Sequence, residues 1–299
     1  MVRGGPLVGL VGQVGVLAAL DQIIGIGVDG WLAGLAYGLV TAAALTVGIH
    51  RAADAARPPS GAKAPRKASL LASAFRVPAF RTSGGVGTSG FLTSGLGYAD
   101  WVTLTRATLV GGVAALVVHA LHTDVPVAPL VAIASVALAL DAVDGVVARR
   151  TGTASPLGAR FDMEVDAFLI LVLSVSVATR LGAWVLAIGA MRYAYVVAGW
   201  ALPWLRRPVP PRYWRKVVAA TQGVTLTAVT SGLFPVSVCV VAVAVALALL
   251  VESFGRDVVW QWHRRHDGVT SDQVANERTT HGDEAHPIEG PERQMSPSG

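Results

Sequence analysis

The chain has 299 residues, of which 53% are hydrophobic and only 14% are charged. This composition is more apolar than that of ordinary soluble domains, so it indicates a membrane protein and argues against a water-soluble globular one. The single cysteine, Cys239, excludes a disulfide within the chain. The net charge is only +5. We expect it to mark cytoplasmic loops, and we expect no nucleic-acid partner.

The first predicted elements are two apolar stretches, residues 7–26 and 31–48. Each is close to the roughly 20 residues that a helix needs to span a bilayer. A cleaved signal peptide is the alternative for the first stretch, but only Arg3 precedes it and the small-residue cleavage pattern is poor. We therefore predict two uncleaved transmembrane helices within residues 1–49.

A polar, irregular segment follows at residues 50–99. It is basic, with Asp54 as its one acidic residue, and its end is rich in Gly and Ser. The GGVGTSG run lacks the lysine and the flanking strand and helix signals of a phosphate-binding loop. The composition therefore predicts a flexible cytoplasmic linker.

Six further hydrophobic segments come next, and each is long enough to span a membrane, although the fifth is polar for such a helix. They lie at residues 101–120, 126–148, 160–179, 182–203, 217–234 and 236–254. They predict an all-α integral membrane protein in which a six-helix domain, residues 100–254, follows two extra N-terminal transmembrane helices.

Charge placement predicts the orientation of these helices. The linker, the Arg149/Arg150 loop, the loop at 206–216 and the residues after 254 are all basic near the membrane. Because basic loops face the cytoplasm, we expect eight helices with both termini inside. Residues 255–299 are polar without apolar periodicity, which indicates a disordered cytoplasmic tail.

Four carboxylates lie between the second and third of the six segments: Asp141, Asp144, Asp162 and Asp166. Spacings of three and four residues place the members of each pair on one helix face. At about 1.5 Å per residue, Asp141 and Asp166 each lie about 12 Å from the intervening loop, so all four converge in a helical hairpin. Clustered carboxylates in apolar surroundings repel one another, and divalent cations compensate for this. Oxygen-only ligands suit Mg²⁺, Mn²⁺ or Ca²⁺.

Two other interpretations of these acids were considered. An EF-hand calcium loop needs acidic or amide groups at alternating positions and a distal Glu, and that pattern is missing. A cation-transport site within a membrane bundle remains an alternative.

The same stretch carries a family resemblance. Its residues match the signature D-x2-D-G-x2-A-R-x8-G-x3-D-x3-D at every fixed position, which are Asp141, Asp144, Gly145, Ala148, Arg149, Gly158, Asp162 and Asp166. The sequence thus resembles the CDP-alcohol phosphatidyltransferases over roughly residues 98–254. The resemblance does not extend to residues 1–50 or to the tail.

The resemblance implies metal-dependent transfer of a phosphatidyl, or related CDP-linked alcohol phosphate, group in phospholipid biosynthesis. An acceptor hydroxyl attacks the β-phosphorus of a donor such as CDP-diacylglycerol and displaces CMP. The resemblance also implies Mg²⁺ or Mn²⁺ as the cofactor, with Asp141, Asp144 and Asp162 as metal ligands. It makes Asp166 the general base and a further contact to the metal.

The resemblance implies a nucleotide site as well. Four signature residues are expected there, and a T-x-x-R at the start of the first of the six helices adds two more. The set is Thr103, Arg106, Gly145, Ala148, Arg149 and Gly158.

We expect the acceptor to bind Arg192, Arg215, Lys216 and Gln222. Arg192 lies mid-membrane, Arg215 and Lys216 open the next helix, and Gln222 lies further along that helix. A basic pocket suits a small phosphorylated alcohol. Family members are often homodimers, so a homodimer in the lipid membrane is one expected state. We expect a multi-pass plasma membrane protein with its active site facing the cytoplasm. The alternatives are a membrane cation transporter and an inactive CDP-lipid-binding membrane protein.

Overall fold

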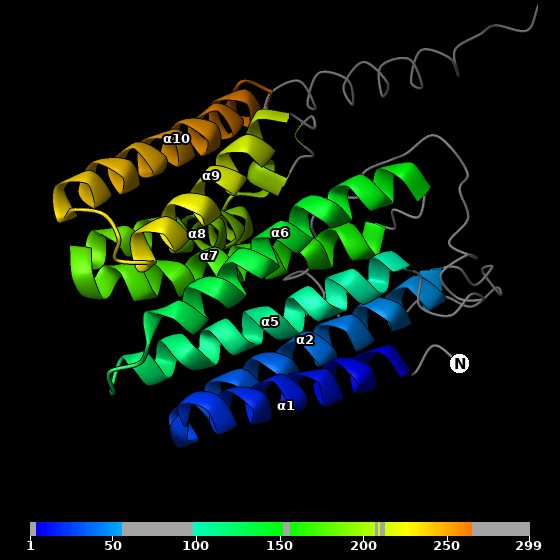
Figure 1. Ribbon diagram of the computed structural model, residues 1–299. Helices are drawn as coiled ribbons and strands as arrows, with labels where there is room; N and C mark the ends of the chain where they lie inside the picture. The colour runs from blue at the N-terminus through cyan, green and yellow to red at the C-terminus, as the bar shows by residue number, and fades with distance from the viewer. Residues whose placement is uncertain (1–3, 56–97, 152–155, 207–208, 210–212, 265–299) are drawn as a thin grey trace, which may run out of the picture.

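The computed structural model describes residues 4–55, 98–151, 156–206, 209 and 213–264. All regular structure in these ranges is helical, as predicted, and eight α-helices account for most of it (Figure 1). Their bounds are α1 Gly4–Ile24, α2 Gly27–Ala55, α5 Tyr98–Ala120, α6 Val127–Thr151, α7 Pro156–Leu181, α8 Leu186–Ala201, α9 Tyr213–Thr230 and α10 Val236–His263. Two short 3₁₀ helices, Ala183–Val185 and Pro203–Arg206, flank α8.

Glycine and proline end the helices where the chain must turn. Gly25 follows α1 with φ of 74°, Gly27 begins α2 with φ of 63°, and Gly232 lies in the α9–α10 connection with φ of 70°. These left-handed conformations favour glycine, which has no Cβ to clash. Pro235 then precedes the first residue of α10.

Five of these helices are long and apolar enough to cross a membrane: α1, α2, α5, α8 with its 3₁₀ lead-in, and α10. Eight spans were predicted. The apolar part of α6, Val127–Val143, is shorter, and α7 carries three acids in its first half. The helices that supply the acidic residues are therefore those whose apolar character is interrupted.

The helix α5 lies at the centre of the bundle and packs against α1, α2, α6 and α7 (Figure 1). On its other side α7 packs against α8 and α9, and α10 packs against α9. The hairpin of α1 and α2 thus lies on the opposite side of the bundle from α10 (Figure 1).

Close helix contacts join this N-terminal hairpin to α5. A Cβ at Gly12 of α1 would come 3.3 Å from the Thr108 side chain of α5. A Cβ at Gly112 of α5 would come 3.0 Å from Val16 of α1. Small residues let transmembrane helices approach closely, so the hairpin belongs to the same packed bundle as the helices that follow.

The helix α10 extends to His263 and passes the predicted end of the last segment at residue 254. Asp257 and Gln261 in this extension are buried. The Arg215 guanidinium donates to Asp257 at 2.9 Å, and Gln261 Nε2 donates to the Leu205 carbonyl at 3.1 Å. Because these polar contacts hold the end of α10 against its neighbours, residues 255–263 are helical. The rest of the predicted tail, and most of the predicted linker, lie outside the described residues.

Candidate active site

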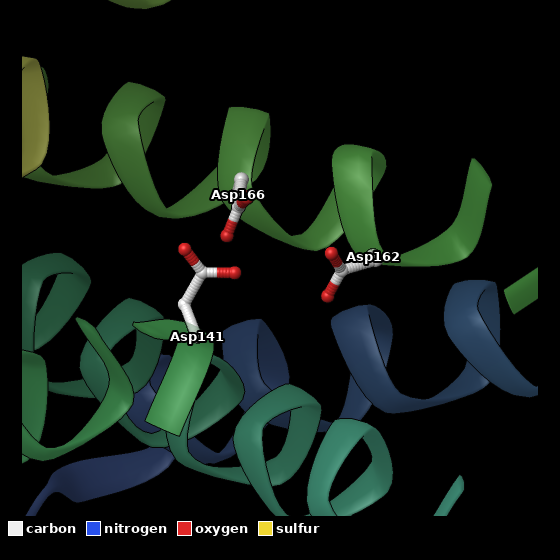
Figure 2. A group of neighbouring side chains, drawn as sticks. All are labelled: Asp141, Asp162 and Asp166. Carbon is white, nitrogen blue, oxygen red and sulfur yellow. The ribbon is translucent and has the colours of Figure 1, made fainter. Parts of the chain in front are cut away.

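Three of the four signature aspartates meet between α6 and α7. Asp141 projects from α6 toward Asp162 and Asp166, which lie one turn apart on α7 (Figure 2). One carboxylate oxygen from each lies within 4.8 Å of the others. We call these residues the acidic triad. The side chain of Asp144, one turn after Asp141, is outside the described residues, so its predicted place in the cluster stays a prediction.

Arg106 of α5 reaches into the acidic triad. Its guanidinium bonds to the carboxylates of Asp141 and Asp162, and its Nη2 lies 3.2 Å from Asp166 Oδ1. The same nitrogen donates to the Asp162 carbonyl at 3.1 Å. A planar guanidinium suits such a role because its donors are held in a rigid fork. Arg106, expected at the nucleotide, therefore also joins α5 to both helices that carry the acids.

The site is buried on one side and open on the other. The Arg106 side chain is 1% exposed, whereas the three aspartate side chains are 33–39% exposed. Arg106 is thus part of the protein interior, while the carboxylates face a region that a substrate or an ion can enter.

These residues fit a divalent cation. Three carboxylates offer hard oxygen ligands, which is the donor type that Mg²⁺ and Mn²⁺ take. A single guanidinium can balance only one of the three negative charges when all three are ionised. The arrangement therefore leaves excess negative charge and unshared carboxylate oxygens around one point, as a cation site requires.

The other predicted nucleotide residues are only partly described. Thr103 and Gly158 are half-buried and lie one turn before Arg106 and Asp162 respectively, so both are on the helices that form the site. The side chains of Gly145, Ala148 and Arg149 lie outside the described residues. Their roles remain predictions.

The predicted acceptor residues do not form one group in the described part of the chain. Arg192 of α8 pairs with Glu164 of α7, and Arg215 pairs with Asp257. Gln222 is fully buried and donates through Nε2 to the Ala246 carbonyl at 2.8 Å, a contact between α9 and α10. Lys216 is exposed on α9, which packs against both α6 and α7. Of the four, Lys216 is thus the residue whose side chain is exposed.

Sequence reasoning missed two residues near the site. Glu164 lies between Asp162 and Asp166 in the sequence. An arginine in the middle of a membrane helix, such as Arg192, needs a partner, and Glu164 is that partner. Tyr37 of α2 had no signal, because it lies far from the signature in an apolar stretch. Its ring stacks on Phe168, two residues beyond Asp166, with centroids 4.5 Å apart.

The fold and the acidic triad describe a helical membrane protein with a carboxylate cluster that fits a divalent cation. The family model for CDP-alcohol phosphatidyltransferase matches residues 96–251, which is more than half of the chain. The chain therefore belongs to the CDP-alcohol phosphatidyltransferase family. No curated protein and no solved structure matches it. The family assignment agrees with the resemblance noted from the signature residues.

Proposed function

We propose that this protein transfers a phosphatidyl, or related CDP-linked alcohol phosphate, group from a CDP-alcohol such as CDP-diacylglycerol to an acceptor alcohol. CMP is the second product. The observation that carries this proposal is the convergence of Asp141, Asp162 and Asp166 in a chain of this family. The intact spacing of all eight signature residues argues against an inactive binding protein.

The chemistry divides among the residues of the site. The acceptor oxygen forms a bond to the β-phosphorus of the donor, and the bond from that phosphorus to the oxygen shared with CMP breaks. Asp166 accepts the proton of the acceptor hydroxyl, since its carboxylate is partly exposed and next to the other two acids. Arg106 holds the carboxylates in position.

Asp141, Asp162 and Asp166, with Asp144 as a predicted fourth ligand, would hold Mg²⁺ or Mn²⁺. When bound, the ion neutralises the diphosphate and stabilises the departing CMP. The acceptor is proposed to be a small phosphorylated alcohol that binds near Lys216. The exposed position of Lys216 on α9, a helix that packs against both α6 and α7, supports this placement.

The test is CMP release from CDP-diacylglycerol by the protein purified in detergent, with and without Mg²⁺ or Mn²⁺. The acceptor is supplied as a panel of phosphorylated and neutral alcohols, and mass spectrometry identifies the lipid product. We expect CMP release that requires both the metal and one acceptor. Metal-dependent ion flux in proteoliposomes without any CMP release would instead support the cation transporter.

A further inference from the structure

The end of α10, residues 255–263, has a distribution of side chains that is unusual for a helix leaving the membrane. Asp257 and Gln261 are only 8% and 1% exposed, whereas Val259 and Trp262 are 56% and 47% exposed. An amphipathic helix on the surface of a soluble domain turns its apolar side chains inward and its polar ones outward. This segment has polar groups inside and large apolar groups outside, as a helix in contact with lipid does.

The buried polar groups of the segment are paired within the protein. The Arg215 guanidinium donates to Asp257 at 2.9 Å. The Tyr195 hydroxyl donates to Gln261 Oε1 at 2.7 Å, and Gln261 Nε2 donates to the Leu205 carbonyl at 3.1 Å. Polar residues at membrane depth face the interior of the bundle and pair there, because lipid offers them no partner. The inner face of the segment meets this requirement.

The outer face of the segment combines apolar, aromatic and basic residues. Arg256 lies on it near Val259, with 65% of its side chain exposed, and pairs with Glu252 one turn earlier. Arg264 follows α10 and lies 4.5 Å from the centroid of the Trp260 ring. Tryptophan and long basic side chains gather at the membrane–water interface, where their apolar parts contact lipid and their polar groups reach the headgroups.

A neighbouring helix adds a tryptophan to the same surface. Trp214 in the first turn of α9 is 44% exposed, and its Nε1 donates to Glu252 of α10 at 3.2 Å. The start of α9 and the end of α10 lie at one end of the bundle (Figure 1). We use the name interfacial surface for Trp214, Arg256, Val259, Trp260 and Trp262.

The length of α10 also favours contact with the headgroup layer. Its 28 residues span about 42 Å at 1.5 Å per residue. The hydrocarbon core of a bilayer is about 30 Å thick, and the two headgroup layers bring the total to about 40–45 Å. Val241, Val245, Val251 and Val259 are each at least half exposed, so the outward apolar face continues from the spanning part of α10 into its last turns.

We propose that the interfacial surface binds the phospholipid headgroup layer on the side predicted to be cytoplasmic, so that α10 contacts lipid up to its end at His263. The hydrophobic segment predicted from the sequence ends earlier, at residue 254. The first turn of α9, with Arg215 and Lys216, then also lies at headgroup depth, because Arg215 pairs with Asp257. This inference does not depend on the proposed enzymatic activity, since it uses only the polarity and length of these helices.

The test is the membrane depth of a spin label at Val259→Cys, made in a Cys239→Ala background of the full chain. The protein is reconstituted in vesicles of phosphatidylcholine and phosphatidylglycerol. Electron paramagnetic resonance then compares collisions of the label with oxygen, which concentrates in lipid, and with a water-soluble nickel chelate. Val245→Cys, on the spanning part of the same outward face, is the matched deep reference, and free label in buffer is the aqueous reference.

We expect the ratio of oxygen to nickel collisions at Val259 to lie between the ratios of the two references, with a lower value at His263→Cys. Val259→Cys is a small change at an exposed position, so its thermal midpoint before labelling should match that of the Cys239→Ala parent. A ratio at Val259 equal to that of free label would place the surface in water and overturn the proposal. Protection of the label from both reagents would show that protein covers the surface, and would overturn it as well.

Discussion

At the scale of single residues, Arg106 compensates part of the negative charge of the acidic triad. It is buried and bonds to carboxylates from α6 and α7. Removing one partner of a buried ion pair leaves the other charges uncompensated. Arg106 therefore balances part of the negative charge of the three acids, and the proposed divalent cation would balance more of it.

This gives a prediction for Arg106→Gln. The variant should lose stability in metal-free buffer, but less than the about 3–5 kcal/mol of a fully buried pair, because solvent reaches the three carboxylates. Added Mn²⁺ should recover part of the loss, because it neutralises the same carboxylates. Thermal unfolding in detergent measures both quantities, with Arg256→Gln on the exposed face of α10 as the control. An unchanged midpoint would contradict this role of Arg106.

Asp166 and Asp162 should respond differently to replacement by asparagine. Asp166→Asn keeps the size of the side chain but removes its ability to accept the proton, so turnover should fall about 10²–10⁴-fold. Donor binding should largely persist, because the other proposed ligands would still hold the ion. Asp162→Asn should weaken metal and donor binding together, because the diphosphate loses its cation. CMP release and CDP-diacylglycerol binding, each with and without Mn²⁺, separate the two effects. Near-normal turnover in Asp166→Asn would refute the base assignment.

Lys216 and Arg215 form a second pair for comparison. Lys216→Gln should raise the acceptor KM more than the donor KM, since loss of a charge-assisted phosphate contact costs roughly 1.5–3 kcal/mol. Arg215→Gln should mainly lower stability, because Arg215 is paired with Asp257. Steady-state kinetics with the acceptor found by lipid mass spectrometry test this. The assignment of Lys216 fails if donor and acceptor KM change equally.

At the scale of elements, the contact between α7 and α8 depends on Gly189. A Cβ at this position would lie 2.5 Å from the Leu171 Cα atom, a backbone atom that cannot move without displacing α7. The same two helices carry Arg192 and Glu164, so their separation also affects this ion pair.

We therefore predict that Gly189→Ala destabilises the protein by about 1–3 kcal/mol, as overpacking of a filled interior does. Gly255→Ala on α10 is the control, because a Cβ there meets no atom within 4 Å. That change should stabilise the exposed helix by about 0.5–1 kcal/mol. Thermal midpoints in detergent test both predictions. Equal midpoints for the two variants would show that the close approach of α7 and α8 does not determine the stability of the protein.

At the scale of the whole molecule, the arrangement of charge predicts a membrane topology. Cysteines introduced into residues 50–99 and 208–211, in a Cys239→Ala background, should be labelled only from the cytoplasmic side. Cys239 is buried, so its replacement removes the chain's one native thiol with little change at the surface. Labelling of either segment from outside would refute the arrangement of eight spans with both termini inside.

The sequence alone determined the helical class, the places of most helices and the convergence of Asp141, Asp162 and Asp166. These features depend on local periodicity and on spacing along neighbouring helices, which a sequence displays directly. The ends of α9 and α10 were less predictable. Whether a polar residue such as Gln261 continues a helix depends on what it contacts, and its partners, Tyr195 and Leu205, come from other elements.

Only the tertiary structure decided which residues surround the acidic triad. Arg106 lies 35 residues before Asp141 along the chain, and Tyr37 comes from a hairpin that carries none of the signature. Hydropathy places such a residue in a membrane helix, but it does not specify which neighbour that helix packs against or which face it turns inward. Those contacts are set by the packing of α2, α5 and α7 in three dimensions. For that reason the convergence of the three aspartates was predictable, whereas the contacts that Arg106 makes to them were not.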